Sequence, residues 1–284
     1  MNIAVRAHAK INWALNITGI RPDGYHTLDM LMQSIELGDD MSFEDDDKLT
    51  LTVNGQPDPN AESNLVIRAA RALMRYAGVQ RGAAISLEKH VPSRAGLGGG
   101  SADCALTLRA LNRLWALGVS DDELLTLGIS LGADVPFCLT GGLAQVKGIG
   151  ERISPIANAP VLPLVLVTPG DGLSTAEVFR LWDRGDYPPV VLDTGRLASA
   201  VCRRDLSAVD ALAANALTAP ALSLLPEIGE TMVRLRALGG SAVFMTGSGS
   251  TVVAAFDSPV RAHAAAEALP HAILTHTMSA LPLF

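Results

Sequence analysis

Residues 92–103 read Pro-Ser-Arg-Ala-Gly-Leu-Gly-Gly-Gly-Ser-Ala-Asp, with four glycines in the five positions 96–100. A strand pattern precedes them, because Ile85 and Leu87 alternate with polar residues over 83–89. A helical pattern follows, because apolar residues recur every three or four positions from Cys104 to Trp115. The stretch therefore predicts a glycine loop between a strand and a helix.

A loop of this kind can bind a polyphosphate through backbone N–H groups. Glycine adopts positive φ and has no Cβ to hold a ligand away, and the first amides of a helix lack intrahelical partners at the positive end of its dipole. One or two glycines would favour a plain turn, whereas four favour a phosphate site. It is not a Walker loop, since no Gly-Lys dipeptide occurs, nor a dinucleotide loop, since Ser101 and Asp103 stand where the third glycine would fall.

Composition limits the class of protein. A length of 284 residues suggests about two domains, and 49% apolar with 18% charged residues indicates a globular chain. The net charge of −7 argues against a general binder of nucleic acid or anionic membranes. The N-terminus lacks the unbroken apolar segment of a signal peptide, and three distant cysteines form no C-x-x-C motif. We therefore expect a cytoplasmic protein with reduced thiols and no structural zinc.

The segment Pro-x-x-x-Gly-Leu-Gly-Gly-Gly-Ser at 92–101 resembles the central motif of the GHMP kinases, a family named for galactokinase, homoserine kinase, mevalonate kinase and phosphomevalonate kinase. Ala9-Lys10-Ile11-Asn12 resembles the opening motif of the members that serve isoprenoid pathways. Leu-Gly-Ala-Asp-Val-Pro at 131–136 resembles the segment that carries the catalytic aspartate, and Thr-Gly-Ser-Gly-Ser-Thr at 246–251 resembles a second glycine turn that closes on the phosphates.

The resemblance implies an α+β fold of two domains, the GHMP kinase fold. Residues 1–153 would form a ribosomal-protein-S5-domain-2-like α/β domain that binds ATP, and residues 154–284 a ferredoxin-like domain on the substrate side. The C-terminal pattern agrees with this, since strands are expected at 164–168, at 241–245, up to Phe256 and near Ile273, with helices between them.

The residues themselves leave plainer interpretations open. A lone lysine in an apolar strand, such as Lys10, usually extends to solvent from an edge, and an aspartate at a helix-to-strand turn, such as Asp134, usually caps locally. The resemblance favours a functional role for both. A strand is expected near Phe137, and a turn at 38–40 is expected to end the strand that starts at Tyr25.

Two segments indicate the acceptor, which is the compound that would receive the phosphoryl group. Arg-Pro-Asp-Gly-Tyr-His at 21–26 resembles the segment of the family members that act on 4-diphosphocytidyl-2-C-methyl-D-erythritol, in which the tyrosine stacks on the cytosine and the histidine helps to hold the base. Thr175 and Phe179 match a threonine and an aromatic residue that line the cytidine side of the acceptor site in those family members. They share one helical face, although core packing explains Phe179 equally well.

The activity that the resemblance implies is ATP-dependent phosphorylation of the 2-hydroxyl of that compound, with ATP and Mg²⁺, in non-mevalonate isoprenoid synthesis. Lys10 and Asp134 would be catalytic, and Asn12, Tyr25, His26, Thr175 and Phe179 would bind the acceptor. The residues expected to bind ATP are Pro92, Ser93, Arg94, Ala95, Gly96, Leu97, Gly98, Gly99, Gly100, Ser101 and Ala102, with Ser101 as a weak metal contact. Gly247, Ser248 and Gly249 would close on the phosphates.

Some alternatives stay open. Arg94 occupies a variable loop position, where it either contacts a phosphate or points to solvent. The chain could act on another small alcohol, as homoserine or mevalonate kinase does, or could be a binding protein that has lost its chemistry. The expected partner is a small cytidine-diphosphate molecule, with no nucleic acid or membrane, and the chain would be a monomer or a homodimer.

Overall fold

The computed structural model describes residues 2–185, 187 and 190–282. The chain forms two compact units that alternate along the sequence. Unit 1 comprises Met1–Ala9, Leu37–Val91 and Gly98–Thr140, and unit 2 comprises Lys10–Glu36, Pro92–Leu97 and Gly141–Phe284. Strand β7 (Arg152–Ile156) covers the position where the sequence suggested a boundary, and the division into 1–153 and 154–284 stays a prediction.

Two long strands, β1 (Asn2–Ile20) and β2 (His26–Asp46), pair with each other, and each has residues in both units. Pro22-Asp23-Gly24 predicts a turn between them, and the turn forms there, with Gly24 N donating to Arg21 O at 2.9 Å. The turn predicted at 38–40 is wrong, because β2 continues through it. Gly38 instead allows the backbones of β1 and β2 to approach closely, since a Cβ there would lie 2.6 Å from the carbonyl oxygen of Ala7.

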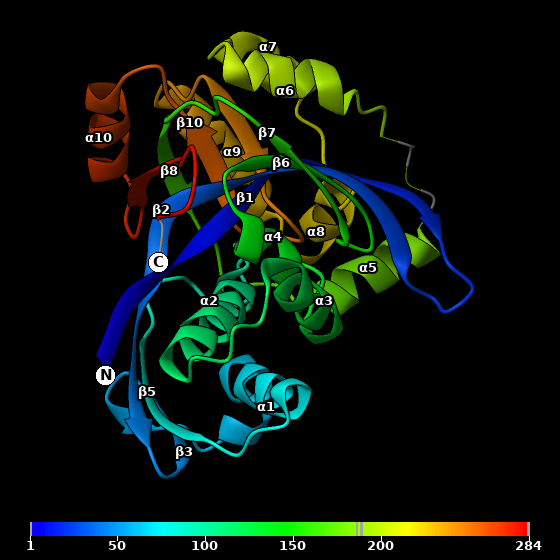
Figure 1. The fold of residues 1–284 in the computed structure, drawn as a ribbon. Coiled ribbons are helices and arrows are strands. Elements are labelled where there is room, and N and C mark those ends of the chain that lie inside the picture. Colours follow the sequence, from blue (N-terminus) through cyan, green and yellow to red (C-terminus); the bar gives the residue numbers. More distant parts are fainter. Residues whose placement is uncertain (1, 186, 188–189, 283–284) are drawn as a thin grey trace. The chain divides into compact units, whose positions relative to one another are not determined.

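Unit 1 contains helices packed beside a sheet. Its strand order is β4 (Gln56–Pro57), β3 (Leu49–Val53), β5 (Gly82–Glu88) and β2, with β3 and β5 parallel. Its helices are the 3-10 turn η1 (Ala61–Ser63), α1 (Leu65–Ala77), α2 (Gly99–Leu114), α3 (Asp121–Leu131) and α4 (Val135–Thr140). Figure 1 shows α1 and α2 side by side, next to β3 and β5.

Local sequence explains where these helices begin and end. The side chain of Asn64 caps α1 by accepting from Val66 N, and Gly78 ends it at φ 66°. The spacing of Ser120 and Glu123 predicts a capping box at the start of α3, and the two residues do bond reciprocally there. The strand predicted near Phe137 is wrong, because that segment is α4. A short apolar run such as Val-Pro-Phe-Cys-Leu does not by itself distinguish a buried helix from a buried strand.

Unit 2 contains a four-stranded antiparallel sheet in the order β11 (Ile273–His276), β8 (Pro163–Val167), β10 (Val252–Ala255) and β9 (Ala242–Met245). Between β8 and β9 run α5 (Thr175–Arg184), α6 (Thr194–Cys202), α7 (Leu206–Leu212), α8 (Thr218–Leu224) and α9 (Glu227–Ala237), and α10 (Pro259–Glu267) joins β10 to β11. This order of strands and helices confirms the predicted ferredoxin-like arrangement.

The rest of unit 2 is a smaller set of strands. Strand β6 (Leu143–Gly148) pairs with β2 over Leu28 to Gln33 and with β7, antiparallel in both cases. Every residue of β9 and β10 is buried, and because successive side chains point to opposite faces, both faces of the sheet are covered at these strands. In the part of the chain that the structure describes, no helix combines the length and the apolar character needed to cross a membrane.

Candidate phosphate and nucleoside site

The start of helix α2, in unit 1, has the geometry of an anion site. Gly98 is its N-cap at φ 70° and no side chain caps it. The first amide that bonds within the helix is that of Ala102, which donates to Gly98 O at 2.9 Å. The amides of Gly99, Gly100 and Ser101 precede that bond, so they have no intrahelical acceptor and lie at the positive end of the helix dipole. The part of the predicted ATP loop at 98–102 is thus a helix N-terminus suited to phosphate.

The segment that carries Asp134 lies beside that helix start within unit 1. A Cβ on Gly132 would be 3.9 Å from the hydroxyl oxygen of Ser101. Asp134 is half-buried and directly precedes α4, where its carbonyl oxygen accepts from Cys138 N at 3.0 Å. The predicted base therefore stands at the start of one helix, next to the start of the helix that is expected to bind phosphate.

In unit 2, Lys10 joins strand β1 to the first part of the glycine loop. Its Nζ donates to Asn12 Oδ1 at 2.8 Å and to Gly96 O at 3.1 Å, and its backbone N donates to Leu97 O at 3.0 Å. The residue is only 3% exposed. Because the ammonium is buried and bonded to loop atoms, Lys10 does not extend to solvent from an edge strand.

The two glycine turns of the sequence are in backbone contact within unit 2. A Cβ on Gly96 would overlap the carbonyl oxygen of Thr246, and one on Gly247 would lie 2.7 Å from Gly96 O. Thr251 N donates to Ala95 O at 3.3 Å, which links the turns a second time. Both Gly96 and Gly247 have positive φ, at 77° and 58°, so glycine is required there for conformation and for space.

Side-chain bonds connect this second turn to other predicted residues. The backbone N of Asn12 donates to Thr246 Oγ1 at 2.8 Å, and Ser248 Oγ lies 2.8 Å from Thr175 Oγ1. The predicted acceptor-binding residues Asn12 and Thr175 thus contact the turn that is expected to close on phosphates. Asn215, which sequence reasoning missed, donates from Nδ2 to the carbonyl oxygens of Met245 and Gly247 at 3.0 and 2.8 Å, and no local pattern marks it.

Arg94 contributes its backbone to the loop. The residue has φ 55° and is exposed. Its carbonyl oxygen accepts from Leu173 N at 3.0 Å, and a Cβ on Gly172 would lie 2.5 Å from that oxygen. The contact fixes the start of the loop against the segment that leads into α5.

An aromatic cluster joins the two segments predicted to hold the base. The ring of His26 lies 4.7 Å from that of Phe179 and 5.7 Å from that of Trp182, and its Nε2 is 2.7 Å from Asp183 Oδ1. Tyr25 is 63% exposed, so its ring is accessible for stacking. Trp182 and Asp183 were not predicted, although they follow Phe179 at i+3 and i+4, the spacing that marks one helical face.

The described residues include no group of three or more His, Cys, Asp or Glu side chains that could hold a metal ion. Mg²⁺ commonly binds through substrate phosphates, water and one or two protein oxygens. The hydroxyl of Ser101, in the first turn of α2, is suited to supply one such oxygen to an ion carried by a nucleotide.

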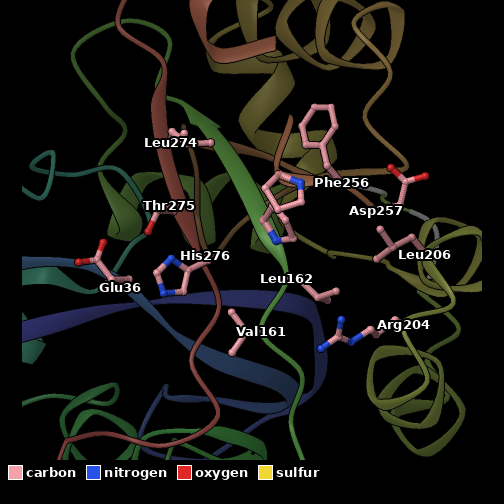
Figure 2. Close-up of a pocket in the computed structure, with 12 residues that line it drawn as sticks. Glu36, Val161, Leu162, Arg204, Leu206, Phe256, Asp257, Leu274, Thr275 and His276 are labelled. Carbon is pink, nitrogen blue, oxygen red and sulfur yellow. The ribbon is translucent and has the colours of Figure 1, made fainter. Parts of the chain in front are cut away.

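A cavity of about 670 Å³ in unit 2 is a separate feature (Figure 2). Leu162, Leu206 and Phe256 form part of its apolar lining, and Arg204 and His276 add polar groups. None of the candidate site residues lines it.

Comparison with known proteins agrees with these features. Residues 64–142 match the family model described as "GHMP kinases N terminal domain", and residues 197–273 match "GHMP kinases C terminal". The chain is 43% identical to a 4-diphosphocytidyl-2-C-methyl-D-erythritol kinase of Pelotomaculum thermopropionicum, over 89% of this chain and 88% of the relative. It is also 43% identical to the enzyme of that name from Cereibacter sphaeroides, over 93% and 92%.

Solved structures are similar over nearly the whole chain. A crystal structure of 4-(cytidine 5'-diphospho)-2C-methyl-D-erythritol kinase superposes with a TM-score of 0.83 at 36% identity, covering 97% of this chain and 99% of that one. A homoserine kinase from Cytophaga hutchinsonii gives a TM-score of 0.74 at 18% identity, covering 98% and 95%. The second likeness supports the fold alone.

Proposed function

The chain belongs to the GHMP kinase family and has its two-domain fold, and we propose that it phosphorylates the 2-hydroxyl of 4-diphosphocytidyl-2-C-methyl-D-erythritol. The phosphoryl donor is ATP, and the products are the 2-phosphate and ADP. The step belongs to non-mevalonate isoprenoid precursor synthesis. Two relatives that are 43% identical to this chain, over 89% and 93% of its length, carry the name of that kinase.

The contact between the rings of His26 and Phe179 is the observation that best supports this acceptor. Homoserine and mevalonate kinases share the phosphate loop but have no need for an aromatic site that receives a nucleobase. Tyr25 is exposed beside His26 in the sequence, and an aromatic face that stacks on a base contributes about 1–3 kcal/mol.

Cytidine 5'-monophosphate tests this assignment. It should inhibit competitively against the acceptor and not against ATP, and Phe179→Ala should weaken the inhibition. A wild-type enzyme that cytidine 5'-monophosphate does not inhibit would contradict the nucleoside site.

The proposed ATP site consists of residues 92–102 and the closing turn Gly247, Ser248 and Gly249. Backbone amides at the start of α2 neutralise phosphate charge, and the contact between Gly96 and Gly247 fixes the shape of the two turns. Mg²⁺ would be held by the nucleotide phosphates with Ser101 as a protein ligand, and it would withdraw charge from the transferred group. The role of the Arg94 guanidinium stays a prediction.

The proposed chemistry uses Asp134 and Lys10. The 2-hydroxyl oxygen forms a bond to the γ-phosphorus while the bond from that phosphorus to the β,γ-bridging oxygen breaks, and the hydroxyl proton passes to the Asp134 carboxylate. Lys10 orients the hydroxyl and stabilises developing negative charge, with Asn12 holding its ammonium at 2.8 Å. Lys10→Met should then reduce kcat about 100-fold or more, a loss that a pure acceptor-binding residue would not cause.

The proposed partners are small molecules, and the proposed location is the cytoplasm.

A further inference from the structure

A buried ion cluster in unit 1 includes residues from both sides of the glycine loop. Lys89 comes shortly before the loop, Asp103 follows in α2, and Asp39 belongs to β2. Lys89 Nζ donates to Asp103 Oδ2 at 2.8 Å and also to Asp39 Oδ2. The two carboxylate side chains are 4% and 0% exposed, so one ammonium group bridges two buried carboxylates.

Asp39 also binds the backbone just before the loop. Its Oδ1 accepts from the N–H groups of His90 and Val91 at 2.6 and 2.8 Å. On the other side of the loop, a Cβ on Gly99 would lie 3.5 Å from Asp39 Oδ2 and 2.9 Å from a methyl carbon of Val91. A single carboxylate therefore binds the last residues before the loop and lies near the first residue of α2.

Burying the charged groups of this cluster costs free energy of folding, which a purely structural role does not explain. Burial alone would lower the pKa of Lys89, but Asp103 and Asp39 together raise it, so the ammonium stays charged. Burial raises the pKa of Asp103 to about 7, against the attraction of Lys89 and with a further rise from Asp39. Among the described residues, Asp103 Oδ1 is buried and has no hydrogen-bond partner. Buried groups left in this state call for an explanation.

We propose that Asp39, Lys89 and Asp103 are positioning residues for ATP. They hold residues 89–91 and 99–103 at the separation that directs the first N–H groups of α2 towards the phosphates. This proposal depends on the proposed function, because it requires the glycine loop to bind ATP. In this account the three side chains touch neither ATP nor the acceptor; they act through the backbone of the loop ends.

Replacement of the bridging cation gives the first test. Lys89→Met keeps the length of the side chain and removes its charge, so the loop ends lose their link. Because misplacement of binding groups by about 1 Å can cost about 100-fold, we expect the KM for ATP to rise by about tenfold or more, with the KM for the cytidyl acceptor unchanged within about twofold. Lys89→Arg, which restores a cation, should recover part of the affinity for ATP. Lys48→Met, at an exposed lysine of the same unit, is the control and should change neither constant.

A second pair of variants covers the case in which Lys89→Met does not fold. Asp39→Asn keeps an acceptor for the amides of His90 and Val91 and removes only the charge. Its matched control is Asp45→Asn, at another carboxylate of β2, which pairs with Arg81 at the surface. Asp39→Asn should weaken the binding of ATP, measured calorimetrically without acceptor, about tenfold, while Asp45→Asn leaves it unchanged.

The calorimetric measurement separates this inference from the choice of acceptor. A wild-type chain that binds ATP but does not use the cytidyl acceptor overturns only the acceptor, and the variants still decide the role of the cluster. Folded Lys89→Met and Asp39→Asn proteins with wild-type affinity for ATP would overturn the positioning role. An equal rise in both Michaelis constants would overturn it too, since that pattern indicates a general loss of structure.

Discussion

His26 and Asp183 stand 157 positions apart in the sequence, and a hydrogen bond of 2.7 Å joins His26 Nε2 to Asp183 Oδ1. A carboxylate only accepts hydrogen bonds, so this bond holds the imidazole with a proton on Nε2. Phe179 and Trp182, on the same helix as Asp183, pack against the ring. Helix α5 thus fixes both the position and the tautomer of a histidine that is expected to hold the base.

Removal of that carboxylate should weaken binding of the acceptor alone. Asp183→Ala leaves the histidine ring less constrained, and a hydrogen bond of this kind contributes about 0.5–1.5 kcal/mol. We expect the KM for the cytidyl acceptor to rise about three- to tenfold, with an unchanged KM for ATP. Glu177→Ala, at an exposed carboxylate in the first turn of the same helix, serves as control. Equal acceptor constants for the two variants would count against a role for Asp183.

Alanine variants at two adjacent residues of α5 distinguish recognition of the base from packing of the core. Phe179 is half-buried, whereas Val178 is 0% exposed. Phe179→Ala should raise the KM for the cytidyl acceptor about 5- to 150-fold, the equivalent of one stacking contact, with a small change in Tm. Val178→Ala should instead lower the free energy of unfolding by about 2 kcal/mol and leave the KM near wild type. If Phe179→Ala only lowers Tm, core packing is its role.

The contact between the two glycine turns can be tested with one methyl group. Gly96→Ala would place a Cβ against Thr246 O, and the residue has φ 77°. We expect a loss of ATP binding of about tenfold or more, because the loop must move to relieve the overlap. Gly118→Ala has a similar φ of 69° with nothing within 4 Å of the new Cβ, so it controls for backbone strain. The same ATP affinity in both variants would show that the contact between the turns is unimportant.

Acid should weaken the start of α3 through its capping box. The hydroxyl of Ser120 donates to Glu123 Oε2 at 2.6 Å, Tyr76 donates to Oε1 at 2.5 Å, and these bonds lower the pKa of Glu123 to about 2. The folded pKa lies below the unfolded one, so the stabilising contribution is present above about pH 4.5 and is lost as pH falls toward 2. Denaturant unfolding of Glu123→Gln and wild type should therefore differ at pH 6 and converge at low pH. A constant difference would exclude the carboxylate as the cause.

Local signals predicted much of this fold. The Ser120 capping box marks a helix start through short-range hydrogen bonds, and the glycines around 98 mark a loop before a helix, so a single stretch of sequence contains the information. The segment at 38–40 misled because Gly and Asp usually indicate turns. Here Gly38 allows close approach to Ala7, and Asp39 is buried to bind the amides of residues 90 and 91.

Those partners are distant in the sequence, and no local pattern shows them. The same reason explains why Asp183 and Asn215 were not predicted as site residues. Asp183 acts on a ring 157 positions away, and Asn215 bonds to carbonyl oxygens about 30 positions away. By contrast, Lys10, His26 and Phe179 could be proposed because each belongs to a motif that is recognisable by itself.

The most direct test is an ATP-consumption assay with four acceptors, 4-diphosphocytidyl-2-C-methyl-D-erythritol, mevalonate, homoserine and galactose, for wild type and Asp134→Ala. We expect wild type to consume ATP with the cytidyl acceptor only and Asp134→Ala to lose kcat by about 100-fold or more. Turnover of another alcohol would contradict the acceptor assigned here, and an Asp134→Ala variant of wild-type activity would contradict the proposed base. ATP binding without turnover of any acceptor would contradict the kinase activity itself.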